Sequence, residues 1–413
     1  MARTDSTFSA RRFGLLVICT VFIMTSSASD CPEKCVCDSE FTVVDCSHQE
    51  LTSVPRDIPL TTTTLNLEGN QLSFLNSSDF ENLDSLTDLI LSDNNLQSIQ
   101  NGTFSIQSSL VRLMLDGNLL ESVDNETFQG TDNLEVLNMD SNNEMSVAPS
   151  TFQSISNLRQ LSVQDTTFVS DYDFSGLTKL EMLEISSCHL EQLDPNNFKE
   201  LNSLTDFYAN ENNLTDFNFV HNLPNLKKLC MSSNLLTEIQ ARAFENNKNL
   251  AKVILDQNAI STLASESFVG PKQIILIKLT LNQLETFPED AFGELNGNES
   301  MRVDLEGNDL NCNQDMSWIT SFVNKDIFRK ATCSSPTCLT GRDITTLASC
   351  DFDCDKEVSG GDAMLGLIIA LSVVSCLLIS LCALMCVRCI RHGHVQSRYK
   401  TLGEVGITSS API

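Results

Sequence analysis

The sequence predicts an α/β solenoid, a curved coil of about eleven short repeats with a parallel sheet along its concave side. A phrase of the form L-x-x-L-x-L-x-x-N-x-L recurs along most of the chain, for example in residues 86–99 (LTDLILSDNNLQSI) and 110–123 (LVRLMLDGNLLESV). Most copies are 24 residues apart, and an Asn usually follows the apolar run at one fixed place. Such a fixed period is typical of repeat architectures.

The second apolar position of the phrase marks each copy. It falls at Leu65, Leu89, Leu113, Leu137, Leu161, Leu183, Phe207, Leu229, Val253, Ile277 and Val303. The short x-L-x-L-x run predicts a strand whose alternate side chains point inward. No single turn can bury its leucines, so turns stack and their strands pair in parallel along the inner curve. This period and phrase match the leucine-rich repeat, whose coil is a horseshoe, here over residues 60–307.

Two further columns belong to the predicted core. The Asn after each strand can bond backbone groups that the turn leaves unpaired. It stands at Asn70, Asn94, Asn118, Asn142, Asn212, Asn234, Asn258, Asn282 and Asn308, with Thr166 and Cys188 in the two other copies. A Phe precedes most marked positions by nine residues and predicts a stacked spine near the outer side. Its members are Phe80, Phe104, Phe128, Phe152, Phe174, Phe198, Phe244 and Phe268, with Val220 in one copy.

The two ends predict an exported, membrane-anchored chain. Residues 1–29 combine Arg11 and Arg12 with an apolar run and then small residues, which predicts a signal peptide. Residues 363–387 are apolar and uncharged, and a transmembrane helix needs roughly 20 such residues. Basic residues follow in the tail, residues 388–413, so the positive-inside rule places this tail in the cytoplasm. We therefore expect a single-pass type I protein of the plasma membrane, with residues 355–362 as juxtamembrane linker.

Five N-x-S/T sequons lie in the predicted exported part and are candidate glycosylation sites. They begin at Asn76, Asn101, Asn125, Asn213 and Asn298.

Residues 30–59 form the pattern C-P-x-x-C-x-C followed by a fourth cysteine, with Cys31, Cys35, Cys37 and Cys46. Spacing alone leaves three connectivities open. Together with the repeats, this pattern resembles extracellular leucine-rich repeat proteins with cysteine-rich caps, such as Slit, Toll-like receptor ectodomains, variable lymphocyte receptors and trophoblast glycoprotein. The resemblance implies the pairs Cys31–Cys37 and Cys35–Cys46, in a cap that covers the open end of the core.

Residues 308–354 resemble the C-terminal cap of the same proteins. The matching positions are Asn308, Cys312, Trp318, Cys333, Ser335, Pro336, Leu339, Gly341 and Arg342. Gln314 replaces the second cysteine of that pattern, and Cys338 is additional. The resemblance implies a Cys312–Cys333 bond, and we expect Cys338 to pair with Cys350 or Cys354.

Two cysteines lie within the repeats. Cys188 occupies a buried position, where a thiol is inert. Cys230 lies between two inward residues and therefore points out of the sheet, which leaves two interpretations open. An exposed thiol would link two chains through an intermolecular disulfide, whereas a shielded one would stay free.

The outward strand residues face the hollow of the arc, where solenoid proteins usually bind. Tyr208, Lys228, Lys252, Ile254 and Lys278 gather towards the C-terminal half of this face. Aromatic and aliphatic side chains beside charge are typical interface anchors. The alternative is a solvated strand face without a ligand.

Composition and motifs argue against several function classes. The chain carries a net charge of −28, which repels nucleic acid and anionic surfaces. His48, His189 and His221, the histidines of the predicted ectodomain, fall in no metal or nucleophile motif. We expect neither an enzyme nor a cofactor.

The cytoplasmic tail is too short to fold alone, since chains below roughly 40 residues seldom do so unaided. Tyr399 and Leu402 fit the Y-x-x-Φ form that clathrin adaptors recognise, although the pattern also arises by chance. Cys386 and Cys389 at the inner membrane boundary are candidates for acylation, or ordinary apolar residues.

Two functions remain. The first is a cell-surface recognition or adhesion receptor that binds a protein ligand through its concave face. The alternative is an innate-immune receptor or co-receptor for microbial molecules that signals through a partner. The absence of a Toll-type intracellular domain favours the first, and the predicted membrane span disfavours a purely structural matrix protein.

Overall fold

The computed structural model describes residues 31–143, 145–168, 173–295, 298, 300–322, 325–349 and 351–352. These residues belong to one compact unit, residues 1–353. The predicted signal peptide, linker, transmembrane segment and tail lie outside the described residues, as do Tyr399, Leu402, Cys386 and Cys389. Within the described part of the chain, no helix is long and apolar enough to cross a membrane.

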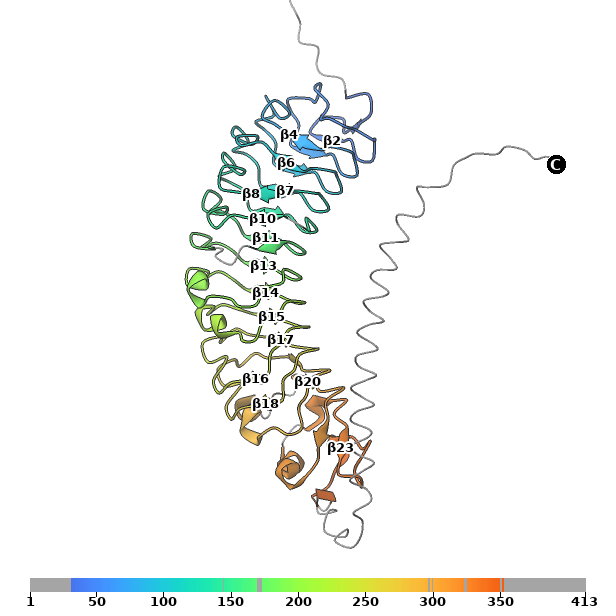
Figure 1. Ribbon diagram of the computed structural model, residues 1–413, viewed down its shortest axis with the longest axis vertical. Coiled ribbons are helices and arrows are strands. Elements are labelled where there is room, and N and C mark those ends of the chain that lie inside the picture. The colour runs from blue at the N-terminus through green and yellow to red at the C-terminus, as the bar shows by residue number, and fades with distance from the viewer. Residues whose placement is uncertain are drawn as a thin grey trace, which may run out of the picture. The chain divides into compact units, whose positions relative to one another are not determined.

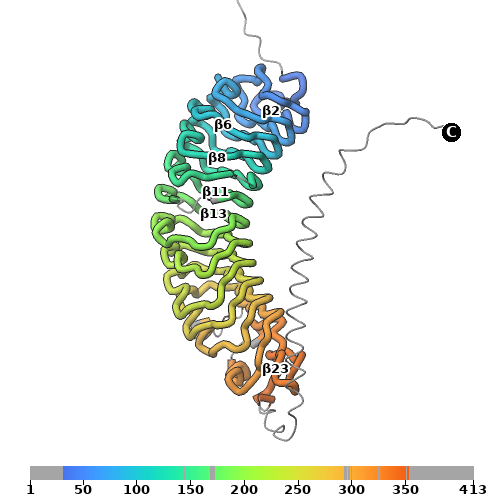
Figure 2. Tube along the Cα trace, in the orientation of Figure 1, coloured from blue at the N-terminus to red at the C-terminus, as the bar shows by residue number. Residues whose placement is uncertain are grey.

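The described residues form a coil that curves along its length (Figures 1 and 2). Fourteen of its strands make the main sheet, in the order β1-β2-β3-β5-β7-β9-β11-β13-β14-β15-β17-β19-β20-β22. The strands are β1 (Val36–Cys37), β2 (Val43–Asp45), β3 (Thr64–Asn66), β5 (Asp88–Ile90), β7 (Arg112–Met114), β9 (Val136–Asn138), β11 (Gln160–Ser162), β13 (Met182–Glu184), β14 (Asp206–Tyr208), β15 (Lys228–Cys230), β17 (Lys252–Ile254), β19 (Leu276–Lys278), β20 (Arg302–Asp304) and β22 (Phe328–Arg329).

The eleven strands from β3 to β20 correspond to the eleven copies of the phrase. In each of them the marked residue is the buried centre of the strand and pairs with its counterpart on the next turn, as Leu89 does with Leu113. All these pairs are parallel, whereas β1 and β2 of the N-terminal cap are antiparallel. Strand β22 of the C-terminal cap adds about one more turn. The predicted solenoid and its parallel sheet are confirmed.

The return side of the coil differs from the predicted α/β class, because the described residues contain no α-helix. Short strands, 3-10 helices and turns fill this side instead. They are β4 (Phe74–Leu75), β6 (Ser98–Ile99), β8 (Ser122–Val123), β10 (Ser146–Val147), β12 (Thr167–Phe168), β16 (Glu238–Ile239), β18 (Thr262–Leu263), η1 (Pro195–Phe198), η2 (Asn218–Asn222) and η3 (Glu289–Leu295). Many of these segments are tight turns, closed by hydrogen bonds such as Asp79 N–H to Asn76 O and Leu83 N–H to Phe80 O. An α-helical turn would need N–H to C=O bonds between residues four apart, whereas these bonds join residues three apart.

The Asn column closes each turn against its neighbours. Asn94 is buried, and its Nδ2 donates to the carbonyls of Leu67 (2.9 Å) and Leu91 (3.1 Å), while its Oδ1 accepts from Leu72 N–H (3.1 Å). Thr166 replaces the amide with a hydroxyl that donates to Val163 O (2.8 Å), and the Cys188 thiol donates to the same carbonyl (3.2 Å). The predicted role of this column is confirmed.

The residue before each member of this column lies in the left-handed region of the backbone. Gly occupies this place in some turns, as at Gly117 (φ 67°), and side chains such as Asp93 (φ 54°) and Leu281 (φ 53°) occupy it in others. A left-handed L-residue costs roughly 1–2 kcal/mol. The bonds of the adjacent Asn hold this turn in place in spite of that cost.

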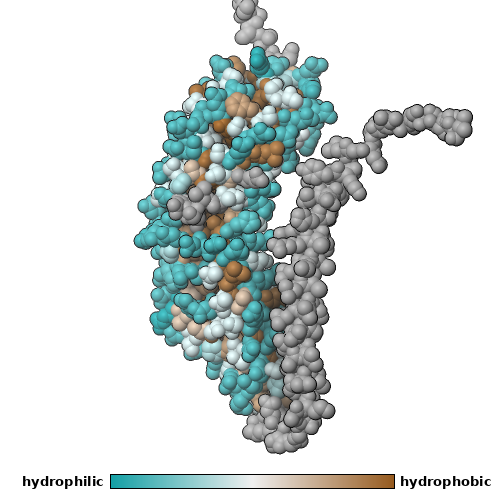
Figure 3. All heavy atoms as spheres, in the orientation of Figure 1, coloured by the Kyte–Doolittle hydropathy of each residue, from teal (hydrophilic) through white to brown (hydrophobic). Residues whose placement is uncertain are grey.

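The Phe column is buried and largely stacked, with ring centroids 5.9 Å apart in Phe80–Phe104 and 5.4 Å apart in Phe244–Phe268. Two rings that the period did not predict bridge the copy with Val220. Phe219 packs on Phe198 (4.7 Å), and Phe217 stacks on Phe244 (5.5 Å). Outside this core, the face shown in Figure 3 is mostly hydrophilic.

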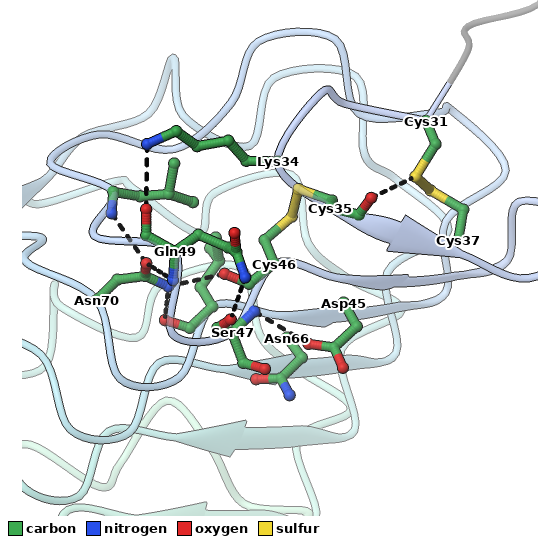
Figure 4. The surroundings of a disulfide bond; sticks show 12 residues. Cys31, Lys34, Cys35, Cys37, Asp45, Cys46, Ser47, Gln49, Asn66 and Asn70 are labelled. Carbon is green, nitrogen blue, oxygen red and sulfur yellow. Dashed lines mark hydrogen bonds between the residues drawn. A yellow bond between two sulfur atoms is a disulfide. The ribbon is translucent and has the colours of Figure 1, made fainter.

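Both caps contain the disulfides implied by the resemblance. Cys31–Cys37 and Cys35–Cys46 lie at the N-terminal end (Figure 4), and Cys312–Cys333 closes the C-terminal cap. Cys338 is also disulfide-bonded, while its two expected partners, Cys350 and Cys354, lie outside the described residues.

The remaining elements of the C-terminal cap are β21 (Leu310–Asn311), η4 (Gln314–Ser321), η5 (Lys325–Ile327), β23 (Cys333–Ser335) and η6 (Ile344–Thr346). Trp318 of η4 packs edge-on against Phe287 at 5.7 Å, so this cap seals the last turns of the core.

Asn94→Ala should destabilise the coil by at least about 2 kcal/mol, because each buried group left without a partner costs about 1–3 kcal/mol. Asn95→Ala is the matched control, since Asn95 is the adjacent residue with an exposed side chain. Denaturant unfolding of the purified protein measures both changes. Equal stability of the two variants would contradict a structural role for the Asn column.

Cys35→Ser removes the bond to Cys46, and such a loss costs about 2–5 kcal/mol in small secreted domains. We expect the variant to be retained in the secretory pathway, whereas Cys230→Ser, which breaks no disulfide, should be exported. Quantitative immunoblotting of mature and immature protein tests this, and normal export of both variants would show that the bond is dispensable.

Candidate functional site

The register of the concave sheet brings the five candidate ligand-binding residues together. Tyr208, Ile254 and Lys278 lie in one row across strands β14, β17 and β19, with Cys230 of β15 between the first two. Lys228 and Lys252 are direct register partners in the parallel row beside it. We call these five residues, Tyr208, Lys228, Lys252, Ile254 and Lys278, the β14–β19 patch.

The centre of the patch is a contact between Lys228 and Tyr208 on neighbouring strands. Lys228 Nζ donates to the Tyr208 hydroxyl (3.1 Å) and lies 4.5 Å from the centroid of its ring. This hydrogen bond raises the pKa of Lys228 above its usual value, so the amine stays charged. Both side chains are half-buried, which fixes the aromatic ring and the charge in one arrangement before any ligand binds.

The lysines of the patch are poorly neutralised by their own protein. Lys228 and Lys252 are like charges at paired positions of adjacent strands. Neither amine forms an ion pair with a residue that the structure describes, and Lys278 reaches Asp256 only at 4.0 Å. In a chain with a net charge of −28, this positive cluster contrasts with its surroundings.

Acidic side chains on the same sheet have internal partners instead. Asp140 accepts from the Ser162 hydroxyl (2.7 Å) and from Gln164 N–H (2.7 Å), and Glu184 accepts from Ser186 N–H (2.9 Å). Burial raises the pKa of both carboxyl groups, although these hydrogen bonds oppose it. Their hydrogen-bonding capacity is therefore partly used within the sheet.

The interpretation of Cys230 as an exposed thiol is wrong. Its side chain leaves the sheet on the concave side, as expected, but Cys230 is only 5% exposed. Tyr208 and Ile254 flank it in the register, and the Lys228–Tyr208 contact spans the adjacent strands. Burial raises the pKa of the thiol to about 11. An intermolecular disulfide at this position is therefore not supported.

One patch neighbour was missed by sequence reasoning. Leu276 is half-buried on the concave side of β19 and is the register partner of Lys252. It continues the row of Lys228 and Lys252, so an alignment of the repeats places Leu276 beside the patch. With Ile254, it gives the patch an aliphatic component.

The five sequons all lie outside the strands of the concave sheet. Asn101, Asn125 and Asn213 are exposed, whereas Asn76 and Asn298 are half-buried, and Asn298 Nδ2 donates to Ile274 O (2.8 Å). None of the five predicted attachment points therefore lies on the concave strands themselves.

The described residues offer no metal centre, since they contain no group of three or more His, Cys, Asp or Glu side chains that could hold an ion. His48, His189 and His221 are exposed on separate turns.

Comparison with known families agrees with this geometry. Residues 108–168 and 248–310 match the family model described as leucine rich repeat, and residues 30–59 match the leucine rich repeat N-terminal domain. The chain contains leucine-rich repeats and their N-terminal cap. Such domains are typically binding modules and not enzymes.

Individual relatives align over short segments. Chondroadherin-like protein of Mus musculus is 46% identical over 63 residues, which cover 15% of this chain and 8% of that protein. Leucine-rich repeat and transmembrane domain-containing protein 1 of Mus musculus is 37% identical over 75 residues, 18% of this chain and 21% of that protein. The alignments thus span less than a quarter of either relative.

A solved structure shares the leucine-rich repeat fold. A chain in the octameric complex of Latrophilin 3 (Lec, Olf), Unc5D (Ig, Ig2, TSP1) and FLRT2 (LRR) superposes with a TM-score of 0.67. The superposition covers 78% of this chain and 100% of that chain at 20% sequence identity. It shows a common fold.

The burial of Cys230 predicts low thiol reactivity in the native protein. With a pKa of about 11, the thiol stays protonated between pH 7 and pH 9, and the thiolate is the reactive form. We expect no reaction of Cys230 with a maleimide reagent at pH 7.5 until denaturant is added, as measured by peptide mass spectrometry. Rapid native labelling, or a dimer on a non-reducing gel that Cys230→Ser abolishes, would contradict the burial.

Proposed function

We propose that this protein is a cell-surface recognition or adhesion receptor that binds a protein ligand through the β14–β19 patch. The observation that carries the proposal is the Lys228–Tyr208 contact, a fixed aromatic and cationic pair on the concave face. Beside it lie Ile254 and two further lysines.

The chemistry of the patch suits a protein partner. Interface cores favour aromatic residues, and energetically important residues cluster near the centre of an interface. Tyr208 and Ile254 supply apolar contact area, and the lysines supply positive charge that carboxylates of a partner would neutralise. A ligand that brings apolar and acidic side chains together therefore fits this surface best.

The setting of the domain supports an extracellular role. Disulfides persist in oxidising compartments, and both caps contain them. One relative is named a leucine-rich repeat and transmembrane domain-containing protein, and the structural neighbour comes from a complex with other proteins. From these two similarities we propose for this chain only that it binds proteins outside the cell.

The anchoring and trafficking of the protein are part of the proposal. Residues 363–387 would hold the repeats at the plasma membrane as a single-pass type I protein, with residues 388–413 in the cytoplasm. Tyr399 and Leu402 would bind a clathrin adaptor, and acylated Cys386 and Cys389 would keep the tail near the bilayer.

The test uses cells that display the full chain and a panel of purified cell-surface ectodomains, followed by charge reversal. Lys228→Glu combined with Lys252→Glu should weaken binding of the identified ectodomain at least tenfold, equivalent to about 1.4 kcal/mol. Lys248→Glu with Lys272→Glu is the matched control, because both lysines are exposed away from the concave strands and the net charge changes equally.

Equal binding by the two double variants would place the ligand site elsewhere. Binding to a parallel panel of microbial glycans, with no binding to any ectodomain, would contradict the adhesion role and support the immune one.

A further inference from the structure

A pocket of about 270 Å³ lies away from the concave sheet, between the turns that contain β14 and β15. Its walls include Thr215, Asp216, Phe217, Thr237, Glu238 and Gln240. We propose that the N-linked glycan of Asn213, part of the sequon Asn213-Leu214-Thr215, docks into this pocket with its first sugar rings. This inference is independent of the ligand site on the concave face.

The local backbone places Asn213 beside the pocket. Asn213 and Thr215 are exposed and Leu214 between them is buried, so residues 213 and 215 point outward on the same side. Residues two apart in extended chain are separated by about 6–7 Å. Since Thr215 lines the pocket, a glycan that begins at Asn213 reaches the pocket within its first one or two rings.

The next turn continues this surface. Leu235 N–H donates to Leu214 O (2.9 Å), which aligns Leu235 with Asn213 and Thr237 with Thr215. Leu235 is 51% exposed and lies on the side from which the glycan would start. The apolar face of a sugar ring passing over Leu235 would shield it from water.

The walls of the pocket match the chemistry of a carbohydrate. Thr215 and Thr237 supply hydroxyl groups and Gln240 an amide, while Asp216 and Glu238 supply carboxylates. One oxygen of Asp216 accepts from Asn218 N–H (3.0 Å), and one oxygen of Glu238 accepts from Gln240 Nε2 (3.1 Å). Each carboxylate has a second oxygen for a sugar hydroxyl.

The pocket volume and its floor also fit. Pockets for drug-sized ligands measure about 300–1,000 Å³, so a smaller volume suits one or two sugar rings. Phe217 is 7% exposed and is held by its stacking on Phe244 (5.5 Å), which gives the pocket a rigid aromatic boundary.

Asn101 provides an internal comparison. It is exposed on a turn of the return side, and its Nδ2 donates to Glu126 Oε2 (2.7 Å). The hydroxyl of its sequon belongs to Thr103, which is buried and donates to Gln100 O (2.6 Å), so this threonine has a structural role in the turn. The Asn101 sequon thus uses its threonine inside the turn, whereas Thr215 is both sequon residue and pocket wall.

The experiment reads the composition of each glycan by glycopeptide mass spectrometry on the full chain expressed in mammalian cells and purified from their surface. A docked glycan is protected from trimming enzymes, so we expect Asn213 to retain oligomannose chains while Asn101 carries fully processed ones. In Glu238→Ala with Gln240→Ala, the Asn213 glycan should become processed to the level of Asn101. Both substituted side chains are exposed, so folding should be preserved.

The matched control is Gln97→Ala with Glu121→Ala, which alters the same kinds of side chain in the wall of a separate pocket on earlier turns. It should leave the Asn213 glycan as in the unmodified protein. Three results would overturn the proposal: an unmodified Asn213, the same processing at Asn213 and Asn101, or no change at Asn213 in the pocket variant.

Discussion

The hydrogen bonds of the Asn column are the interaction on which the rest of this structure depends. Each turn must leave its strand through a residue in the left-handed region, and at Asp93 and Leu281 that residue carries a side chain. The amide of the following Asn bonds carbonyls of its own turn and of the previous one, as Asn94 does with Leu91 and Leu67. One side chain therefore fixes both the shape of the turn and the stacking of the next.

This stacking determines where functional side chains meet. Because each strand pairs with the next in the same register, residues at one position of the repeat become neighbours on the surface. The sequence alignment of the repeats was therefore enough to predict the strands, the core columns and the row that contains Tyr208, Ile254 and Lys278. The cap disulfides required more, because spacing left three connectivities open and only the resemblance distinguished them.

What could not be predicted depends on contacts between side chains of different turns. The direction of Cys230 followed from alternation along its strand, but its burial depends on the half-buried side chains around it. The bridging rings Phe217 and Phe219 lie off the nine-residue offset, in a copy that is only 22 residues long. The missing helices have a local cause instead, since the short return segments close as tight turns through their own backbone bonds.

Acidic and basic side chains of the concave face differ in how their charges are satisfied, and this difference bears on binding. Asp140 and Glu184 accept hydrogen bonds from their own sheet, so a partner gains little by contacting them. Lys228 and Lys252 are register partners that form no ion pair with a described residue, so a partner carboxylate would gain interactions that the sheet does not supply. The electrostatic part of the binding free energy would then come from the lysines, beside the ring of Tyr208 that Lys228 already holds.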